Sequence, residues 1–513
     1  MSEARDKEGS LTARTFWLMS AKTLAFAFAF ALPVLLTRRL SQTEYGLFKQ
    51  VFLVVTTAVA VLPLGFSMSA YYYLAREHDE RRRGSIIFNI LLFSGAVGGA
   101  ACLALVARPD LLTIVFKEPA LASYAPLVGL VILLWLFSSF LEVVAVANQE
   151  MRLATLFIVG AQLTKTLLML AAALVYDSVE ALIYAALAQG ALQTLVLCLY
   201  LRTRFPGFWR GFDLATLRAQ AAYAMPFGAA GLLYSLLMDL HNYFVSHRFD
   251  AATFAVYSVG VAQLPLVGIL RESVGTVMIP RVSQLQKRGE TREIVVLLAR
   301  AMRKLAAVYL PLYALLMVVG REFLTVLFTE AYAASWPVFA VNLTLLPLSI
   351  LEFDAVIRAY AEHKYFMLKL RVVLFALLVV ALWFGVLRFG LVGAIAVVVA
   401  INLVERAATS LKFGRVIGIR AGDVLMLIDV GKLALASALA AVAAFVTRAM
   451  VVQGGVRPLF VLVVTGSVFA VVYLAAVWLL GVPDDDERAS LRRRVVRLQR
   501  RTQEGVRAAH PLS

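Results

Sequence analysis

Charge, cysteine and histidine are all scarce in this sequence. Only 16% of the 513 residues are Asp, Glu, Lys or Arg, whereas about a quarter of a soluble domain is charged. The two cysteines, Cys102 and Cys198, fall inside predicted apolar helices, and no Cys-x-x-Cys or Cys/His cluster occurs. We interpret them as small apolar residues rather than a redox pair or metal ligands. The low charge argues against a soluble globular fold.

Motifs for metal or nucleotide chemistry are also missing. The sequence has five histidines, and His78, His247, His363 and His510 fall in predicted loops or in the tail without metal-ligand spacing. No Walker motif is present, which argues against direct use of ATP. We therefore expect no metal and no cofactor.

Long apolar runs fill the chain instead. Hydrophobic residues make up 61% of it, and apolar runs recur about every 30 residues from Thr15 to Leu480. Each run approaches the roughly 20 residues that a helix needs to cross a bilayer. The first run is longer than a signal-peptide core and contains Lys22, so it is not a cleaved signal. The pattern predicts an all-α polytopic membrane protein with about 14 transmembrane helices. The predicted spans are 14–37, 46–69, 85–107, 124–147, 153–176, 180–201, 221–246, 252–280, 302–320, 336–358, 366–388, 390–411, 424–447 and 458–481.

Lys and Arg in the loops predict the orientation. An even number of spans places both termini on one side. If that side is the cytoplasm, the inner loops and tail hold 34 Lys and Arg residues and the outer loops hold nine. The net charge of +17 thus belongs to the cytoplasmic loops and does not indicate nucleic acid. The basic tail segment 491–501 is either a solvated tail or an amphipathic helix on anionic lipid.

An internal repeat divides the chain. Arg39 to Phe48 matches Arg248 to Tyr257 at an offset of 209 residues, and Leu141 to Val146 matches Leu351 to Val356 at an offset of 210. Two pseudo-symmetric six-helix lobes of the same orientation are expected, with a binding site near the midplane between them. The predicted domains are an N-terminal lobe (1–205), a C-terminal lobe (206–420), two appended spans (421–481) and a cytoplasmic tail (482–513).

The opening of the chain resembles a known family. The motifs are Leu36-Thr-Arg-Arg-Leu-Ser-Gln-Thr-Glu-Tyr-Gly-Leu-Phe48, Leu64-Gly-Phe-Ser-Met-Ser-Ala70 and Leu74-Ala-Arg76, which flank two apolar helices. They are similar to the start of bacterial polysaccharide exporters, including O-antigen-type lipid-linked oligosaccharide flippases of the multidrug/oligosaccharidyl-lipid/polysaccharide (MOP) exporter superfamily. The resemblance implies a V-shaped pair of lobes around a cavity. It also implies transfer of undecaprenyl-pyrophosphate-linked sugar from the inner to the outer leaflet of the cytoplasmic membrane.

Six basic residues lie inside predicted spans: Lys22, Lys49, Lys165, Arg271, Arg406 and Lys432. A charged residue at a helix centre costs about 2.5–3.5 kcal/mol, so it usually faces a cavity or a partner. We predict that Lys22, Lys49, Lys165 and Arg271 bind the pyrophosphate, although Lys49 is also close enough to the outer boundary to reach it. Lys432 lies one turn from Asp429, and the two can neutralise each other.

Acidic and aromatic residues are the remaining candidates. In the resembled fold, spans one, two, seven and eight face the cleft, which implies that Lys22, Lys49, Asp239 and Arg271 do so. Asp239 and Arg271 would pair either only when the site is empty or as a permanent structural ion pair. Glu142, Glu352 and Asp354 are candidates for coupling to a sodium ion, a proton or the membrane potential, or are simply neutral in an apolar setting. Aromatic and amide side chains for the sugar are Tyr71, Tyr72, Tyr73, Tyr234, His241, Asn242 and Tyr243. Prolines and glycines at 33, 63–65, 226, 265–268 and 347 mark candidate hinges or static kinks.

Other functions remain open. A lipid II flippase and a drug exporter belong to the same superfamily, but a drug exporter needs an acidic cavity for cationic drugs. A membrane-embedded polymerase or ligase needs a catalytic outer loop, and the outer loops here have about fifteen residues at most. The partners expected for a flippase are a lipid-linked oligosaccharide, membrane lipids and other polysaccharide assembly proteins.

Overall fold

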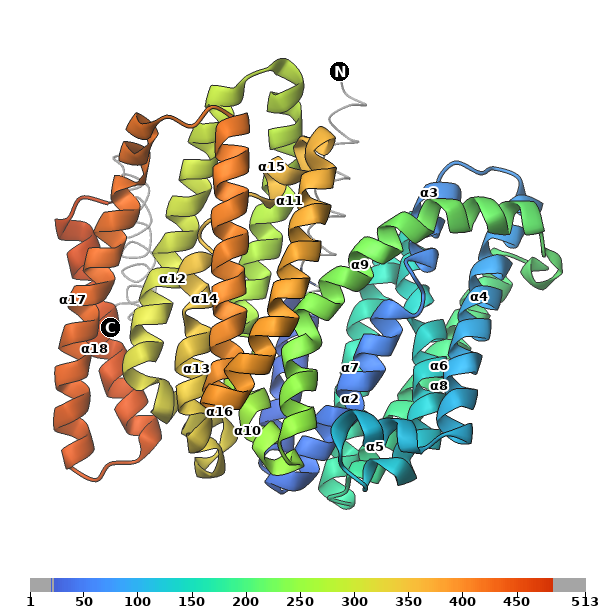
Figure 1. The fold of residues 1–513 in the computed structure, drawn as a ribbon, viewed down its shortest axis with the longest axis horizontal. Coiled ribbons are helices and arrows are strands. Elements are labelled where there is room, and N and C mark those ends of the chain that lie inside the picture. The colour runs from blue at the N-terminus through green and yellow to red at the C-terminus, as the bar shows by residue number, and fades with distance from the viewer. Residues whose placement is uncertain (1–19, 21–22, 483–513) are drawn as a thin grey trace, which may run out of the picture. The chain divides into compact units, whose positions relative to one another are not determined.

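The computed structural model describes residue 20 and residues 23–482, and all regular structure in this part of the chain is helical (Figure 1). Lys22 and the predicted basic tail lie outside the described residues. The first described helix covers Thr23–Leu36. The other α-helices are α2 (Gln42–Val61), α3 (Ser69–Tyr73), α4 (Glu80–Ala107), α5 (Asp110–Phe116), α6 (Leu121–Ala147), α7 (Met151–Val175), α8 (Val179–Arg204), α9 (Leu214–Arg248), α10 (Ala251–Gly260), α11 (Pro265–Arg288), α12 (Thr291–Phe328), α13 (Trp336–Leu343), α14 (Leu345–Leu348), α15 (Asp354–Ala359), α16 (Lys364–Val416), α17 (Ile428–Gln453) and α18 (Pro458–Leu479). Short 3₁₀ turns are η1 (Phe66–Met68), η2 (Phe208–Arg210), η3 (Glu330–Ser335), η4 (Ala361–His363) and η5 (Ala421–Leu427).

The predicted polytopic membrane fold is confirmed. Among the described residues, ten helices are long and apolar enough to cross a membrane, or up to twelve if each bent pair is one span. The helix α16 is counted once, although Gly390 turns the chain inside it with φ 59° and ψ −135°. This turn falls between the two predicted spans 366–388 and 390–411. The helix Thr23–Leu36 is apolar but short within the described part of the chain.

Several predicted spans are interrupted, and their prediction as continuous helices is wrong. Span 46–69 stops at Val61, because Leu64 and Gly65 adopt left-handed conformations with φ 45° and 70°. Span 252–280 is divided into α10 and α11, which are bent by 48°. Span 336–358 is divided into α13, α14 and α15. Each break lies beside a proline marked in the sequence, because proline removes a backbone donor and disfavours helix at the residue before it.

Polar side chains fix where the helices begin. Ser41 forms a capping box with Glu44 at the start of α2, and Asp250 accepts a hydrogen bond of 2.7 Å from the backbone N–H of Thr253 at the start of α10. Asp213 caps α9 in the same way through Ala215 and Thr216. Caps of this kind satisfy backbone donors that have no partner inside the helix.

The described helices group into two compact units, each considered by itself. The larger contains residues up to Arg288 together with Leu324–Leu345 and Phe353–Phe413. Its buried apolar clusters include one around Phe140 and Leu201 and another around Tyr257 and Leu382. This grouping follows packing rather than the sequence repeat, so the predicted lobe boundaries stay a prediction.

The smaller unit joins the start of α12 to the appended helices α17 and α18, which lie side by side (Figure 1). Arg448 donates two hydrogen bonds, of 2.9 and 2.7 Å, to one oxygen of the buried Glu322. Asp429 contacts both Arg303, at 3.2 Å, and Lys432, at 3.4 Å. The predicted Asp429–Lys432 pair is thus confirmed, with Arg303 as an additional partner on α12. Two ion pairs, Arg303–Asp429 and Glu322–Arg448, therefore join α12 to α17.

Candidate functional site: a cationic cavity at paired helical hairpins

The two sequence-related hairpins contact each other directly. Ser41 and Asp250 differ by 209 positions, the offset of the repeat, and each caps the second helix of its hairpin. Just beyond the caps, α2 crosses α10 at Gly46. A Cβ atom built on Gly46 would lie 1.8 Å from the carbonyl oxygen of Ala251, so only glycine permits this approach. The repeat therefore predicts equivalent local structure at this position, and the crossing explains the glycine.

A third segment, from Val326 to Ser335, contacts the connector of the first hairpin, the start of α2 and the helix α10 of the second hairpin. The guanidinium of Arg38 donates to the backbone oxygen of Val326 at 2.6 Å, and the amide of Gln42 donates to that of Ala331 at 2.5 Å. Ser335 donates to the backbone oxygen of Val256 at 2.7 Å. These contacts lie at the end of the helices that the sequence predicts to be the outer side. They close this end of the hairpins in the described arrangement.

The same hairpins line a cavity of about 260 Å³. Its lining residues come from the helix Thr23–Leu36, α2, α10, the break between α10 and α11, and the end of α12. Lys49 is the basic residue in the lining, beside Tyr45, Ser258 and Gln263. Its Nζ atom lies 5.6 Å from the centre of the Tyr45 ring. Lys49 thus lies in a cavity wall, and Pro265 at the break between α10 and α11 lines the same cavity. That Lys49 binds the substrate stays a prediction.

The second predicted lysine of this region, Lys165, lies against aromatic rings. Its Nζ atom is 4.4 Å from the centre of the Trp135 ring and 6.0 Å from that of Phe52. Phe52 follows Phe48 by one turn of α2, and their ring centres are 4.6 Å apart. A cation over an aromatic face is stabilised by about 0.5–2 kcal/mol, more when water is excluded. Lys49 and Lys165 thus bring two basic side chains to this region, one in the cavity wall and one beside the aromatic rings.

The sequence prediction missed the aromatic partners of Lys165. The spacing of Tyr45 with Lys49 and of Phe48 with Phe52 is the i, i+4 pattern of one helix face. That pattern was available from the sequence. Trp135 lies on α6 and Lys165 on α7, and no local signal joins them.

The other predicted basic and acidic residues are spread more widely. Arg271 is an exposed residue of α11, one turn beyond the cavity residue Gly268. Asp239 is partly buried on α9, one turn before Tyr243, whose hydroxyl donates to Leu53 of α2 at 3.4 Å. Glu142 of α6 interacts electrostatically with Tyr71 of α3. The predicted Asp239–Arg271 pair and the ion-coupling roles stay predictions.

Glu352 and Asp354 do not lie inside a continuous span as predicted. Glu352 is buried in the non-helical stretch between α14 and α15, and Asp354 is the first residue of α15. Asp354 forms an ion pair of 2.8 Å with Arg358, one turn away. Glu142 therefore lies in an unbroken helix, whereas its repeat counterpart Glu352 lies at a break.

Most of the predicted sugar-contacting aromatic residues engage in packing. The ring of Tyr72 stacks on that of Tyr223 with centres 4.6 Å apart, and Arg76 lies 3.9 Å from the centre of the Tyr72 ring. His241 is buried and hydrogen-bonds to the hydroxyl of Tyr257 at 2.8 Å. The stacked Arg76, Tyr72 and Tyr223 form a flat surface near the exit of the first hairpin.

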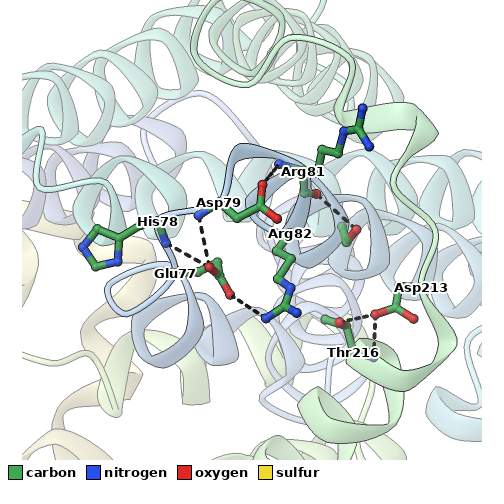
Figure 2. A network of polar contacts seen from close by, with 8 residues as sticks. Glu77, His78, Asp79, Arg81, Arg82, Asp213 and Thr216 are labelled. Atoms are coloured by element: carbon green, nitrogen blue, oxygen red, sulfur yellow. Dashed lines mark hydrogen bonds and ion pairs between the residues drawn. The ribbon is translucent and has the colours of Figure 1, made fainter.

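A polar network organises that exit (Figure 2). Glu77 accepts hydrogen bonds from the backbone N–H groups of His78 and Asp79, and Arg82 approaches it at 3.8 Å. Asp213 of the neighbouring chain segment is bound to Thr216 through its hydroxyl and its backbone N–H. Hydrogen bonds from Thr216 and Ala215, and the charge of Arg82, lower the pKa of Asp213 below its ordinary value. The basic segment that follows the first hairpin thus forms the capped start of α4.

The chain is similar in fold to the lipid II flippase MurJ in an inward closed conformation, with a TM-score of 0.72 at 11% identity over 90% of this chain and 97% of that one. A multidrug resistance MATE family transporter of the MOP superfamily, in an inward-facing conformation, gives a TM-score of 0.57 at 16% identity over 78% and 94%. A MOP superfamily transporter from Pyrococcus furiosus, described as having a binding pocket of reverse polarity, gives a TM-score of 0.54 at 16% identity over 79% of this chain and 95% of that one. No curated protein sequence matches.

The chain is thus similar in fold to these transporters, two of which are described as members of the MOP superfamily. A family model for polysaccharide biosynthesis proteins matches residues 35–337, more than half of the chain. The chain belongs to this polysaccharide biosynthesis protein family. The resemblance noted in its opening residues is therefore confirmed.

Proposed function

We propose that this protein is a flippase for an undecaprenyl-pyrophosphate-linked oligosaccharide. It would move this lipid from the inner to the outer leaflet of the bacterial cytoplasmic membrane by alternating access, for the synthesis of a surface polysaccharide. Both termini would be cytoplasmic. The observation that carries the proposal is Lys49, a basic residue in a cavity between the paired hairpins of a polysaccharide biosynthesis family member.

Electrostatics support an anionic substrate. A pyrophosphate loses hydration when it enters the membrane core, and this loss is expensive unless fixed cations replace the water. Lys49 supplies one such charge in the cavity wall, and Lys165 supplies a second cation beside the rings of Phe52 and Trp135. A cationic drug would be repelled by the same charges, so a drug exporter is the weaker alternative.

The size of the cavity supports a closed state. About 260 Å³ is below the 300–1,000 Å³ of common small-ligand pockets, and it is too small for an oligosaccharide. In this arrangement, the cavity has room for a pyrophosphate-sized group but not for the sugar chain as well. Transport would then require the break between α10 and α11 to bend and the contacts of Arg38 and Gln42 to separate. We propose Asp239, Glu142, Glu352 and Asp354 as candidates for coupling this motion to a sodium ion, a proton or the membrane potential.

Charge substitutions in the cavity test the proposal. In a strain that lacks the native gene, Lys49→Ala and Lys165→Ala are expected to lower surface polysaccharide strongly, and Lys49→Arg is expected to restore most of it. Lys287→Ala, at an exposed position of α11, is the matched control and should export normally. Normal export by both alanine variants at normal protein levels would contradict a cationic substrate site.

The substrate class needs a separate comparison. Wild-type protein should restore surface polysaccharide but should not rescue a strain depleted of its lipid II flippase. It should also give no resistance to cationic drugs. Rescue of the depleted strain would instead assign lipid II as the substrate. Polymer synthesis by the purified protein, without lipid transfer, would assign the polymerase or ligase alternative.

A further inference from the structure

A second pocket shares no lining residue with the cavity around Lys49 and plays no part in the proposed transport site. Its volume is about 480 Å³, and it lies where α5, α9 and the first half of α16 meet. Lys117, His247 and Arg248 supply basic groups to its lining, and Trp383, Val386 and Leu387 supply an apolar wall. The lining of the pocket thus combines basic side chains with an apolar wall.

The pocket holds an unusual share of the outer positive charge. The loops predicted to be outer contain nine Lys and Arg residues in total. Two of them, Lys117 and Arg248, line this one pocket, and Arg388 directly follows the lining residue Leu387. Outer loops are normally depleted of such residues. A cluster retained there therefore calls for a local anionic partner.

The neighbouring helix α5 has an exposed apolar face. It has only seven residues, and Leu111, Ile114 and Val115 on it are 37, 59 and 39% exposed. Their i, i+3, i+4 spacing gives one apolar face, as in helices that lie in the lipid interface. Lys117 directly follows α5 and has a left-handed backbone conformation with φ 55°. Its positive charge therefore lies next to the C-terminal end of the apolar face.

Specific contacts hold α5 against α9. The Nδ1 atom of His247 donates a hydrogen bond of 2.8 Å to the backbone oxygen of Val115. The rings of Phe116 and Tyr243 stack with their centres 5.9 Å apart. These contacts fix Lys117 and Arg248 around the same opening. Trp383, 61% exposed, lies seven residues before the turn at Gly390, or about 10 Å along the helix. Trp383 therefore lies toward the end of this half of α16 that is predicted to be outer.

We propose that this pocket binds an anionic glycerophospholipid of the surrounding membrane. Arg248 would contact the phosphate through paired N–H groups and Lys117 as a point charge, while an acyl chain lies along Trp383 and Leu387. A lipid with a net negative charge is favoured over a zwitterionic one, because two cations face its phosphate. This site is independent of the proposed transport substrate.

Native mass spectrometry of the purified full-length protein tests the site. The protein is offered phosphatidylglycerol and phosphatidylcholine in equal amounts. The wild-type chain should retain phosphatidylglycerol preferentially. A Lys117→Gln, Arg248→Gln double variant should retain about tenfold less, because two charge-assisted contacts are lost. The control is Lys287→Gln, Arg288→Gln, which removes two exposed charges from the end of α11 and should bind as the wild type does.

Further arms separate the sources of phosphate. Inorganic phosphate and undecaprenyl phosphate are added as competitors, and neither should displace phosphatidylglycerol at equal concentration. Displacement by undecaprenyl phosphate, or equal retention by the double variant and the wild type, would overturn the proposal. If the double variant fails to fold, Trp383→Ala at an exposed position supplies the same test, with reduced retention of phosphatidylglycerol expected.

Discussion

Gly46 has no side chain at the point where α2 crosses α10, and we predict that Gly46→Ala destabilises the protein by about 1–3 kcal/mol. A Cβ atom there would lie 1.8 Å from the backbone oxygen of Ala251, and backbone cannot move aside as a side chain can. The measurement is the thermal midpoint of the purified protein in detergent. Gly99→Ala, on α4 with open space around its Cβ position, is the matched control and should be neutral or stabilising. Equal midpoints for the two variants would show that the helices separate easily.

Asp213 predicts a pH dependence of stability. Its folded-state pKa is lowered, first by the hydrogen bond from the Thr216 hydroxyl and then by backbone N–H groups. A lowered pKa stabilises the fold above the ordinary value of about 4, and this contribution disappears as pH falls through the folded-state pKa. Asp213→Asn keeps a capping side chain without the titration. Its thermal midpoint should therefore fall less between pH 5 and about pH 2 than that of the wild type. Parallel curves would show that the cap carries no charge-dependent stabilisation.

The sequence located the basic residues inside the apolar spans more clearly than it indicated which residues surround them. Lys49 and Lys165 were predicted because a lysine inside an apolar span is costly. Their aromatic neighbours were not predicted, since Trp135 approaches Lys165 only through packing of α6 against α7. Glu322 was missed as well, because its partner Arg448 lies 126 residues away.

At the level of the helices, we predict that a covalent bond between the first hairpin connector and the segment that contacts it stops transport. Gln42 lies within hydrogen-bonding distance of the Ala331 backbone, and this contact must break for the outer end to open. We expect a Gln42→Cys, Ala331→Cys variant, in a background without Cys102 and Cys198, to lose transport upon oxidation and to regain it with a reductant. The measurement is surface polysaccharide in cells treated with a mild oxidant.

The control for this covalent bond uses single variants. Neither Gln42→Cys nor Ala331→Cys alone should respond to the oxidant. Full transport by the cross-linked double variant, with the disulfide demonstrated by gel shift, would contradict opening at this end of the hairpins.

The elements also show where helix prediction from the sequence fails. Hydropathy located almost every apolar run, since each must be long enough for a bilayer. It treated 46–69, 252–280 and 336–358 as continuous because apolar residues continue through the breaks. The prolines and glycines in these spans were noted, but whether such a residue bends or ends a helix depends on partners elsewhere. Gly228 illustrates this, because a Cβ on it would lie 1.9 Å from the backbone oxygen of Leu64 in the broken stretch.

At the scale of the whole molecule, the orientation in the membrane decides the direction of transport. The ratio of 34 inner to nine outer Lys and Arg residues predicts that both termini lie in the cytoplasm. His78, beside the basic exit of the first hairpin, should then face the cytoplasm, and Ala120, after α5, should face outward. Both positions are exposed, so cysteine is tolerated at each.

Labelling of cysteine variants in intact cells tests this orientation. In a background without native cysteines, a membrane-impermeant maleimide should label Ala120→Cys at once and His78→Cys only after the cells are made permeable. The reverse pattern would place the Arg38 and Gln42 contacts on the cytoplasmic side. The cavity beside Lys49 would then be closed toward the leaflet where the substrate is made, and the proposed inner-to-outer transfer would have to start from a different conformation. The labelling pattern therefore also determines which step of the cycle the described arrangement represents.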